Sequence, residues 1–167
     1  MAHSSSISWR KGGSIVVNAL ELLAELECGN NAVAYQALLE LERLSEQSDA
    51  VWPFTEKFAQ MAQSDKYAVR VRGFRLFCKQ AKWDRDGVID RYFQTVLPVL
   101  NDKKPTAVRQ ALAALTDIVT YKPELRKAVR QAVESIDVLH YKDSMQGLIY
   151  KDIQSLIRQL DSYANNE

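Results

Sequence analysis

A short sequence motif recurs along the chain at a nearly constant spacing. The segments AVAYQALLEL, AVRVRGFRLF and AVRQALAAL lie 36 and 39 residues apart, measured between their valines Val33, Val69 and Val108. A looser copy, SMQGLIYKDI, places Met145 another 37 residues further on. One unit of this length cannot bury its apolar face alone, so neighbouring units must stack against each other in a line. The repeat therefore predicts four stacked units.

Within each unit the apolar residues recur at the period of an α-helix, and no segment shows the sustained alternation of a strand. The pattern predicts eight helices, at about residues 15–26, 31–45, 53–64, 67–82, 87–100, 105–120, 123–135 and from 143 or 144 onward. Ser14, Asn31 and either Asp143 or Ser144 are expected as N-caps, and Pro98 is expected to bend the end of the fifth helix. We therefore expect an all-α chain whose eight helices form four hairpins of an α-α superhelix.

The composition agrees with one helical domain. Only six Gly and four Pro interrupt 167 residues, which favours long helices. We expect a single domain over residues 14–167, preceded by a mobile leader, residues 1–13, that lacks the apolar stretch of a signal peptide. No apolar run is long enough to span a membrane. Cys28 and Cys78 have no spacing typical of a disulfide framework or a zinc site, which suits a reducing compartment, so we expect a cytoplasmic protein.

Turn aspartates followed by Val-Arg pairs resemble the HEAT repeat. Asp65 precedes Val69–Arg70, and Asp102 precedes Val108–Arg109. The segments AKWD, LNDKKPTAVRQAL, YKPELR and SIDVLHYKDSMQGLIYKDI resemble, more specifically, a family of small bacterial HEAT-like proteins of unassigned function, over about residues 50–160. The resemblance implies an armadillo-type fold of HEAT-like hairpins and brings no catalytic motif. Some members carry an iron–sulfur-assembly label, but a helical chain without clustered cysteines offers no ligands for such a cluster.

A net charge of +1 hides an uneven distribution along the chain. Residues 20–49 have a net charge of −6, whereas residues 66–85 have +6 and residues 103–130 have +5. On a helical wheel, the apolar residues of the fourth helix cover about 240° and leave one basic face. The second helices of HEAT-type hairpins line the concave side, so this face is the candidate binding groove, extended by the next turn. The candidate groove residues are Arg72, Arg75, Lys79, Lys82, Lys103 and Lys104.

Arg70 falls on the packed side of the same helix, where a guanidinium needs a carboxylate or carbonyl partner. Either Asp65 in the preceding turn or Asp102 in the next one can supply it. Arg109 has the same wheel position in its own helix. The interpretation is a structural ladder between repeats, made of turn aspartates and helix arginines; a functional role for Arg70 or Arg109 is the alternative.

The last helix has one apolar side and one polar side. Lys151, Gln154 and Arg158 lie opposite the apolar residues Met145, Ile149, Ile153, Leu156, Ile157 and Leu160. A helix that ends a stack has no further repeat to cover its outer face, so this one-sided pattern predicts a terminal capping helix.

Motifs for nucleotide binding, serine hydrolysis and zinc proteolysis are absent. His140 is a lone loop histidine, and Cys78 falls on the packed arc of its helix, so we expect no metal, no cofactor and no enzyme. Solenoid DNA-alkylation glycosylases are similar in fold class, and Trp83–Asp84–Arg85 is the one stretch that could imitate their pocket. It falls at a helix end, where Asp84 or Asp86 is a more natural cap for the next helix.

The function expected from these features is that of an adaptor. A partly basic concave groove would bind a protein or peptide partner, in particular an acidic segment. The alternative is a nucleic-acid-binding solenoid that uses the basic second and third repeats. An acidic first hairpin at one end of the groove would repel a long polyanion more than a short peptide, which favours the protein partner.

Overall fold

The computed structural model describes residues 12–166, with side chains described from Asn18 onward. Over these residues it contains eight α-helices and five short 3₁₀ segments, and no strand, so the predicted all-α class is confirmed. The helices are α2 (Gly12–Leu26), α3 (Asn31–Gln47), α4 (Thr55–Met61), α5 (Tyr67–Lys79), α6 (Val88–Val96), α7 (Pro105–Tyr121), α8 (Arg126–Glu134) and α9 (Asp143–Ala164). The 3₁₀ segments are η1 (Trp52–Phe54), η2 (Gln80–Trp83), η3 (Leu97–Asn101), η4 (Pro123–Leu125) and η5 (Val138–His140).

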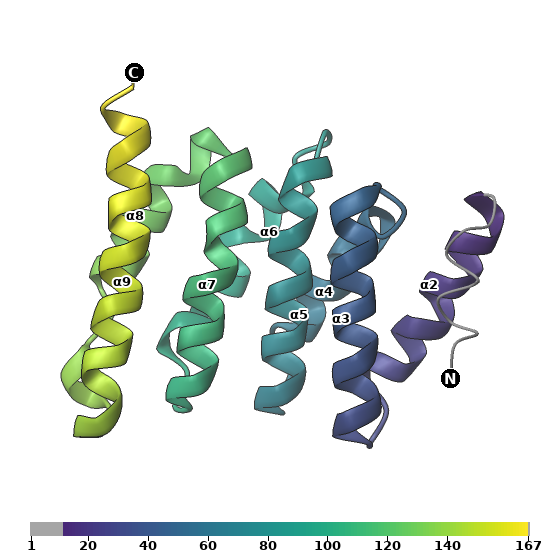
Figure 1. Ribbon diagram of the computed structural model, residues 1–167, viewed down its shortest axis with the longest axis horizontal. Coiled ribbons are helices and arrows are strands. Elements are labelled where there is room, and N and C mark those ends of the chain that lie inside the picture. The colour runs from purple at the N-terminus through teal and green to yellow at the C-terminus, as the bar shows by residue number, and fades with distance from the viewer. Residues whose placement is uncertain (1–11, 167) are drawn as a thin grey trace.

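The helices are stacked side by side in two layers, and both layers extend along the longest axis of the molecule (Figure 1). The second helix of each hairpin, α3, α5, α7 and α9, lies beside the next in a row, and each contacts its neighbour. The first helices α4, α6 and α8 lie behind this row, whereas α2 is tilted away at one end. Because the row contains one helix from each hairpin, every helix in its middle must be buried on both flanks.

One continuous hydrophobic core connects all four hairpins. It extends from Leu26 in the first hairpin to Leu160 in the last, and each middle hairpin contributes phenylalanines with almost no exposed surface. These are Phe58, Phe74, Phe77 and Phe93. Phenylalanine buries more apolar area than most residues, so these rings supply much of the driving force for stacking.

Helices α4 and α5 approach each other closely at Gly73. A β-carbon built on Gly73 would lie 2.6 Å from the Met61 β-carbon and 2.7 Å from two backbone atoms, the Phe58 oxygen in α4 and the nitrogen of Ala62 at its C-terminal end. Backbone atoms cannot move aside as a flexible side chain can, so only glycine allows the two helices to pack this closely. Cys78, on the same helix, is buried, as expected for a small apolar residue.

Several helix ends differ from the sequence-based prediction. The α3 cap is Asn30 rather than Asn31, because the Asn30 side chain accepts hydrogen bonds from two first-turn amides. Helix α9 has Lys142 at its N-cap position, so Asp143 and Ser144 both lie inside the helix. Helix α2 begins at Gly12, two residues before the expected Ser14 cap. The rest of the expected leader lies outside the described residues.

Two other predictions about helix ends are confirmed. The predicted fifth helix ends as a tighter 3₁₀ turn, η3, that contains Pro98. Asp84 covers the start of α6, where its carboxylate accepts hydrogen bonds from the amides of Val88 at 3.1 Å and Ile89 at 2.9 Å. Asp84 therefore has the structural role expected of a helix cap.

Helix α9 has the one-sided burial expected of a terminal helix. Ile149, Ile153, Leu156 and Leu160 are buried, whereas Lys151 and Arg158 are exposed. No described helix covers the outer side of α9 (Figure 1).

Replacement of Gly73 by alanine tests the close approach of α4 and α5. We expect Gly73→Ala to lower the free energy of unfolding by about 1–3 kcal/mol, the usual cost of overpacking a well-filled core. Gly147→Ala is the matched control, because nothing lies within 4 Å of a β-carbon there. That control should gain roughly 0.5–1 kcal/mol, since alanine favours a helix over glycine. Urea denaturation of both variants measures this; equal stability of Gly73→Ala and the parent would contradict the packing.

Candidate binding groove

An open groove of about 370 Å³ lies on the face formed by α3, α5 and α7. Small side chains on α7, Ala113 and Ala114, leave the space open, and charged or amide groups stand around them. The lining residues are Glu42, Arg75, Lys79, Gln110, Ala113, Ala114 and Asp117. Two of the predicted groove residues, Arg75 and Lys79, therefore do line a groove, but together with acidic residues that the sequence analysis did not select.

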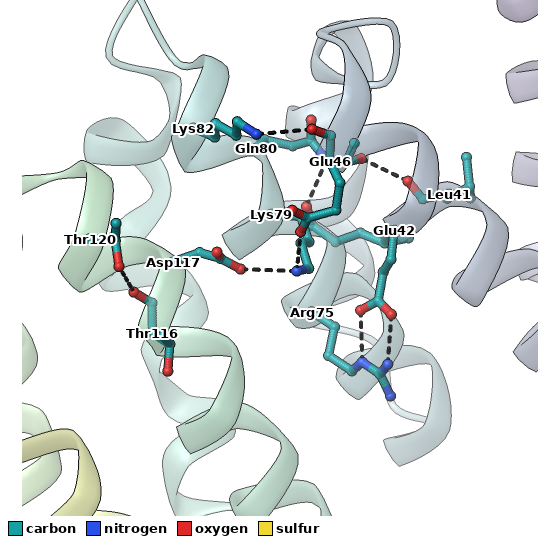
Figure 2. A network of polar contacts seen from close by, with 12 residues as sticks. Leu41, Glu42, Glu46, Arg75, Lys79, Gln80, Lys82, Thr116, Asp117 and Thr120 are labelled. Carbon is teal, nitrogen blue, oxygen red and sulfur yellow. Dashed lines mark hydrogen bonds and ion pairs between the residues drawn. The ribbon is translucent and has the colours of Figure 1, made fainter. Parts of the chain in front are cut away.

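All three guanidinium nitrogens of Arg75 donate hydrogen bonds to side chains of neighbouring helices. Figure 2 shows the pair with Glu42. Its guanidinium donates to both carboxylate oxygens of Glu42 on α3, at 3.0 and 2.7 Å. The remaining nitrogen, Nη1, donates to the side-chain oxygen of Gln110 on α7 at 3.0 Å. A bidentate pair of this kind fixes the orientation of the arginine as well as its charge. Arg75 thus connects three consecutive second helices.

Lys79 also connects these three helices (Figure 2). Its ammonium group lies 2.5 Å from Glu46 of α3 and 3.5 Å from Asp117 of α7. Burial alone would lower the pKa of Lys79, but the hydrogen bond to Glu46 and the charge of Asp117 raise it above its ordinary value. The lysine therefore stays charged, and one cation serves two carboxylates.

Asp117 is the less compensated of those two carboxylates. Burial raises the pKa of Asp117 above its ordinary value; Lys79 offsets part of this effect, and the charges of Glu46 and Glu42 add to it. By contrast, the hydrogen bond from Lys79 holds the pKa of Glu46 below its ordinary value. On the α7 wall of the groove, Asp117 thus lies farther from the shared ammonium group than Glu46 does.

The expected exposure of the whole basic face is wrong. Arg72 is only 7% exposed, and its guanidinium donates to the Asn31 side chain at 2.9 Å and to the Leu26 carbonyl at 3.4 Å. The acidic first hairpin and α5 lie side by side, so this arginine closes the junction between them rather than facing water. Lys82 is exposed, and its ammonium donates to the Glu46 carbonyl at 2.9 Å.

Lys103 and Lys104 do not line this groove. Both precede α7, at the end of the row where α5 and α7 begin, and both are exposed. Lys103 lines a separate hollow beside Arg70 and Asp102, and the Lys104 ammonium lies 5.3 Å from the centre of the Tyr67 ring. The expected extension of the basic groove into the third repeat is therefore absent from the groove that the structure describes.

The predicted ladder between repeats is present at Arg70. Its guanidinium contacts the buried Asp102 carboxylate at 2.8 Å and donates to the backbone carbonyls of Ser64 and Asp65. Of the two candidate carboxylates, Asp102 is therefore the ion-pair partner, and Asp65 contributes its carbonyl only.

Arg109 forms an ion pair with the next repeat, as predicted, but its partner is not a turn aspartate. It pairs with Asp152 on α9, at 2.6 Å from Nε, and not with an aspartate in the next turn. The aspartate available in that turn, Asp137, accepts from the Leu139 amide and covers the start of η5. Tyr141 reaches back instead, and its hydroxyl donates to the Asp102 carbonyl at 2.7 Å.

A second groove of about 240 Å³ follows between α7 and α9. Its polar groups are hydroxyls, an amide and the paired Asp152. The lining residues are Leu112, Ala113, Thr116, Asp152, Ser155, Leu156 and Gln159. Ala113 lines both grooves, so the two adjoin at this residue.

The predicted groove residues did not include four residues that line the two grooves, Glu42, Gln110, Asp117 and Asp152. A signal for the first was available: Glu42–Arg75 and Glu46–Lys79 are each separated by 33 residues, close to one repeat. Opposite charges one repeat apart on neighbouring second helices predict ion pairs across the seam. A helical wheel considers one helix alone and therefore assigns its polar face to water.

Among the described residues, no group of three or more His, Cys, Asp or Glu side chains could hold a metal ion. None of the described helices combines the length and apolar character needed to cross a bilayer. Comparison with protein families, curated proteins and solved structures found no match.

A double-mutant cycle tests the ladder. Arg70→Met and Asp102→Asn should each destabilise the fold, and their coupling free energy should be about 0.5–3 kcal/mol, as for residues in direct contact. Asp65→Asn should show no coupling to Arg70→Met, because Asp65 offers only its backbone carbonyl. Unfolding free energies from urea titration supply all terms; coupling through Asp65 would contradict the observed geometry.

Arg72→Met tests the burial of Arg72. The substitution leaves the Asn31 and Leu26 acceptors without this donor, so we expect a loss of about 1–3 kcal/mol in unfolding free energy. Lys82→Met, on the exposed end of the same segment, should change stability by no more than about 0.5 kcal/mol. Equal effects of the two substitutions in thermal melting would indicate that Arg72 faces solvent after all.

Proposed function

We propose that this chain is a non-catalytic adaptor of the HEAT-like type that binds a protein or peptide segment across its second helices. The single observation that supports this most is the open groove between α5 and α7, with alanines in it and hydrogen-bonding groups around them. The second groove adjoins it at Ala113. This geometry suits an extended chain that crosses the row of helices.

The polar groups around the two grooves suit a peptide backbone. Each residue of an extended segment carries one N–H donor and one C=O acceptor that need partners once water is displaced. Gln110 on one side of Ala113 can offer its NH₂ group, since its oxygen accepts from Arg75. On the other side, Thr116 and Ser155 offer hydroxyls and Gln159 offers its side-chain oxygen, since its amide nitrogen donates to Thr116 and Thr120. Peptide binding by an extended segment uses main-chain hydrogen bonds for affinity and side-chain pockets for specificity.

The pairing of the basic residues argues against a polyanion in this groove. A phosphate backbone binds through lysines and arginines whose counterions can be released. Arg75 and Lys79 are already paired with Glu42, Glu46 and Asp117. The acidic partner expected from the sequence depended on the same unpaired charges, so the groove no longer favours it.

We also propose a cytoplasmic location. Cys28 and Cys78 are both free thiols, as a reducing compartment would keep them.

Selection of linear peptides from a random displayed library tests the proposal. Peptides enriched on the parent protein should lose at least about tenfold in affinity on Ala113→Trp, a factor that corresponds to about 1.4 kcal/mol. This substitution fills the junction of the two grooves, and Ala113 is exposed, so the fold should tolerate it. Ala24→Trp, at an exposed position on α2 outside both grooves, is the matched control and should bind as the parent does.

Failure to enrich any peptide, or binding that Ala113→Trp leaves unchanged, would contradict the proposal. Salt-sensitive duplex binding that is lost on Lys103→Glu and Lys104→Glu would instead favour the nucleic-acid-binding alternative, since both lysines are exposed at the end of the row.

A further inference from the structure

We propose that the groove between α5 and α7 receives a lysine or arginine side chain of the bound segment, with Asp117 as the carboxylate that binds it. This inference rests on the proposed adaptor function and names the chemistry of the partner. It reverses the expectation of an acidic partner, because the carboxylates of the groove were not part of that expectation.

Lys79 is shared unequally between two carboxylates. Its ammonium lies 2.5 Å from Glu46 but 3.5 Å from Asp117, and it is the one cation of the described residues within 4 Å of the Asp117 carboxylate. Asp117 is nevertheless mostly buried, with 24% of its side chain exposed. A buried carboxylate needs close donors to offset its lost hydration. A cation from a ligand would supply them.

Arg75, the other basic residue of the groove, cannot turn to Asp117 without breaking a hydrogen bond. Arg75 uses three nitrogens on Glu42 and Gln110. Across α7, Arg109 holds Asp152 with two nitrogens. The compensation that Asp117 lacks is therefore left for a bound molecule to provide.

The space beside Asp117 suits a side chain with an apolar stem and a charged head. Ala113 and Ala114 precede it by four and three residues on α7, so their methyl groups lie on the same helix face as the carboxylate. The groove beside them has a volume of about 370 Å³. Lysine and arginine combine an apolar stem with a charged head, so the stem can lie on the alanines while the head reaches Asp117.

An acidic occupant fits less well. A carboxylate in the same position would lie beside Asp117 and Glu42, with Arg75 and Lys79 already neutralised. In a partly buried site, a like charge this close is strongly unfavourable. The second groove is different: its single carboxylate, Asp152, is paired, and its other polar groups are uncharged. We therefore expect one basic residue in the first groove and an uncharged polar stretch in the second.

Titration with defined peptides tests the inference. The probes are short Gly-Ser peptides with a single central arginine, lysine or glutamate, added to protein labelled at its alanine methyl groups. We expect saturable shifts of the Ala113 and Ala114 methyl signals with the arginine and lysine peptides, and none with the glutamate peptide at equal concentration. The shifts should weaken with added salt, because the contact is an ion pair.

Asp117→Asn is the decisive variant. It keeps the shape of the side chain and removes the charge, and we expect at least a tenfold loss of affinity for the basic peptides. Asp161→Asn is the matched control, because Asp161 is an exposed carboxylate that pairs with Arg130 on the far side of the stack. Asp117→Asn should fold as well as the parent, since burial already opposes the ionised carboxylate.

Three results would overturn the inference: no methyl shift with the basic peptides, equal shifts with the glutamate peptide, or equal affinities of Asp117→Asn and Asp161→Asn. Its failure is distinguishable from that of the adaptor function. If library-selected peptides depend on Ala113 but need no basic residue, the adaptor function stands and the role of Asp117 is wrong. If no selected peptide depends on Ala113, the adaptor function itself is wrong.

Discussion

The structure depends on polar pairing across the seams between neighbouring second helices. A helix in the middle of the row is buried on both flanks, so a charged side chain at the edge of a flank must find its partner on the next helix. Arg75 pairs with Glu42, Lys79 with Glu46 and Arg109 with Asp152, each time one helix away in the row. Paired in this way, partly buried charges stabilise the order of the helices instead of opposing burial.

A buried cluster of charges around Lys122 also connects neighbouring elements through ion pairs. Its ammonium lies 3.1 Å from Asp84 and 2.5 Å from Asp90, and the indole nitrogen of Trp52 also donates to Asp84. Burial alone would lower the pKa of Lys122, but the Asp90 and Asp84 carboxylates raise it well above its ordinary value. The cluster thereby connects the second hairpin, the start of α6 and the end of α7. Removal of one partner would leave a buried charge uncompensated.

The repeat period, the helix count and the packed side of α9 could be predicted from the sequence because each follows from spacing along one element. The partner of Arg70 was narrowed to two aspartates by the same reasoning. The site could not be predicted this way. A helical wheel assigns Arg72 and Lys79 to the polar side of α5, but it cannot say that Asn31 and Glu46 of a neighbouring helix cover that side. Contacts between repeats depend on the register of the stack, which a wheel drawn for one helix does not contain and which the 33-residue spacing of Glu42–Arg75 and Glu46–Lys79 indicates only when two repeats are compared.

Neighbouring helices neutralise Arg75 and Lys79, the two basic residues of α5 that line the groove, so that the groove does not attract anions. Paramagnetic relaxation of the Ala113 and Ala114 methyl groups by a cationic and an anionic nitroxide of equal size measures the local potential directly. Both methyl groups lie in the groove beside Asp117. Because Arg75 and Lys79 are neutralised, we predict relaxation at least as strong from the cationic probe as from the anionic one. Clearly stronger relaxation from the anionic probe would show that the basic residues of the groove are unpaired, and would contradict their neutralisation by neighbouring helices.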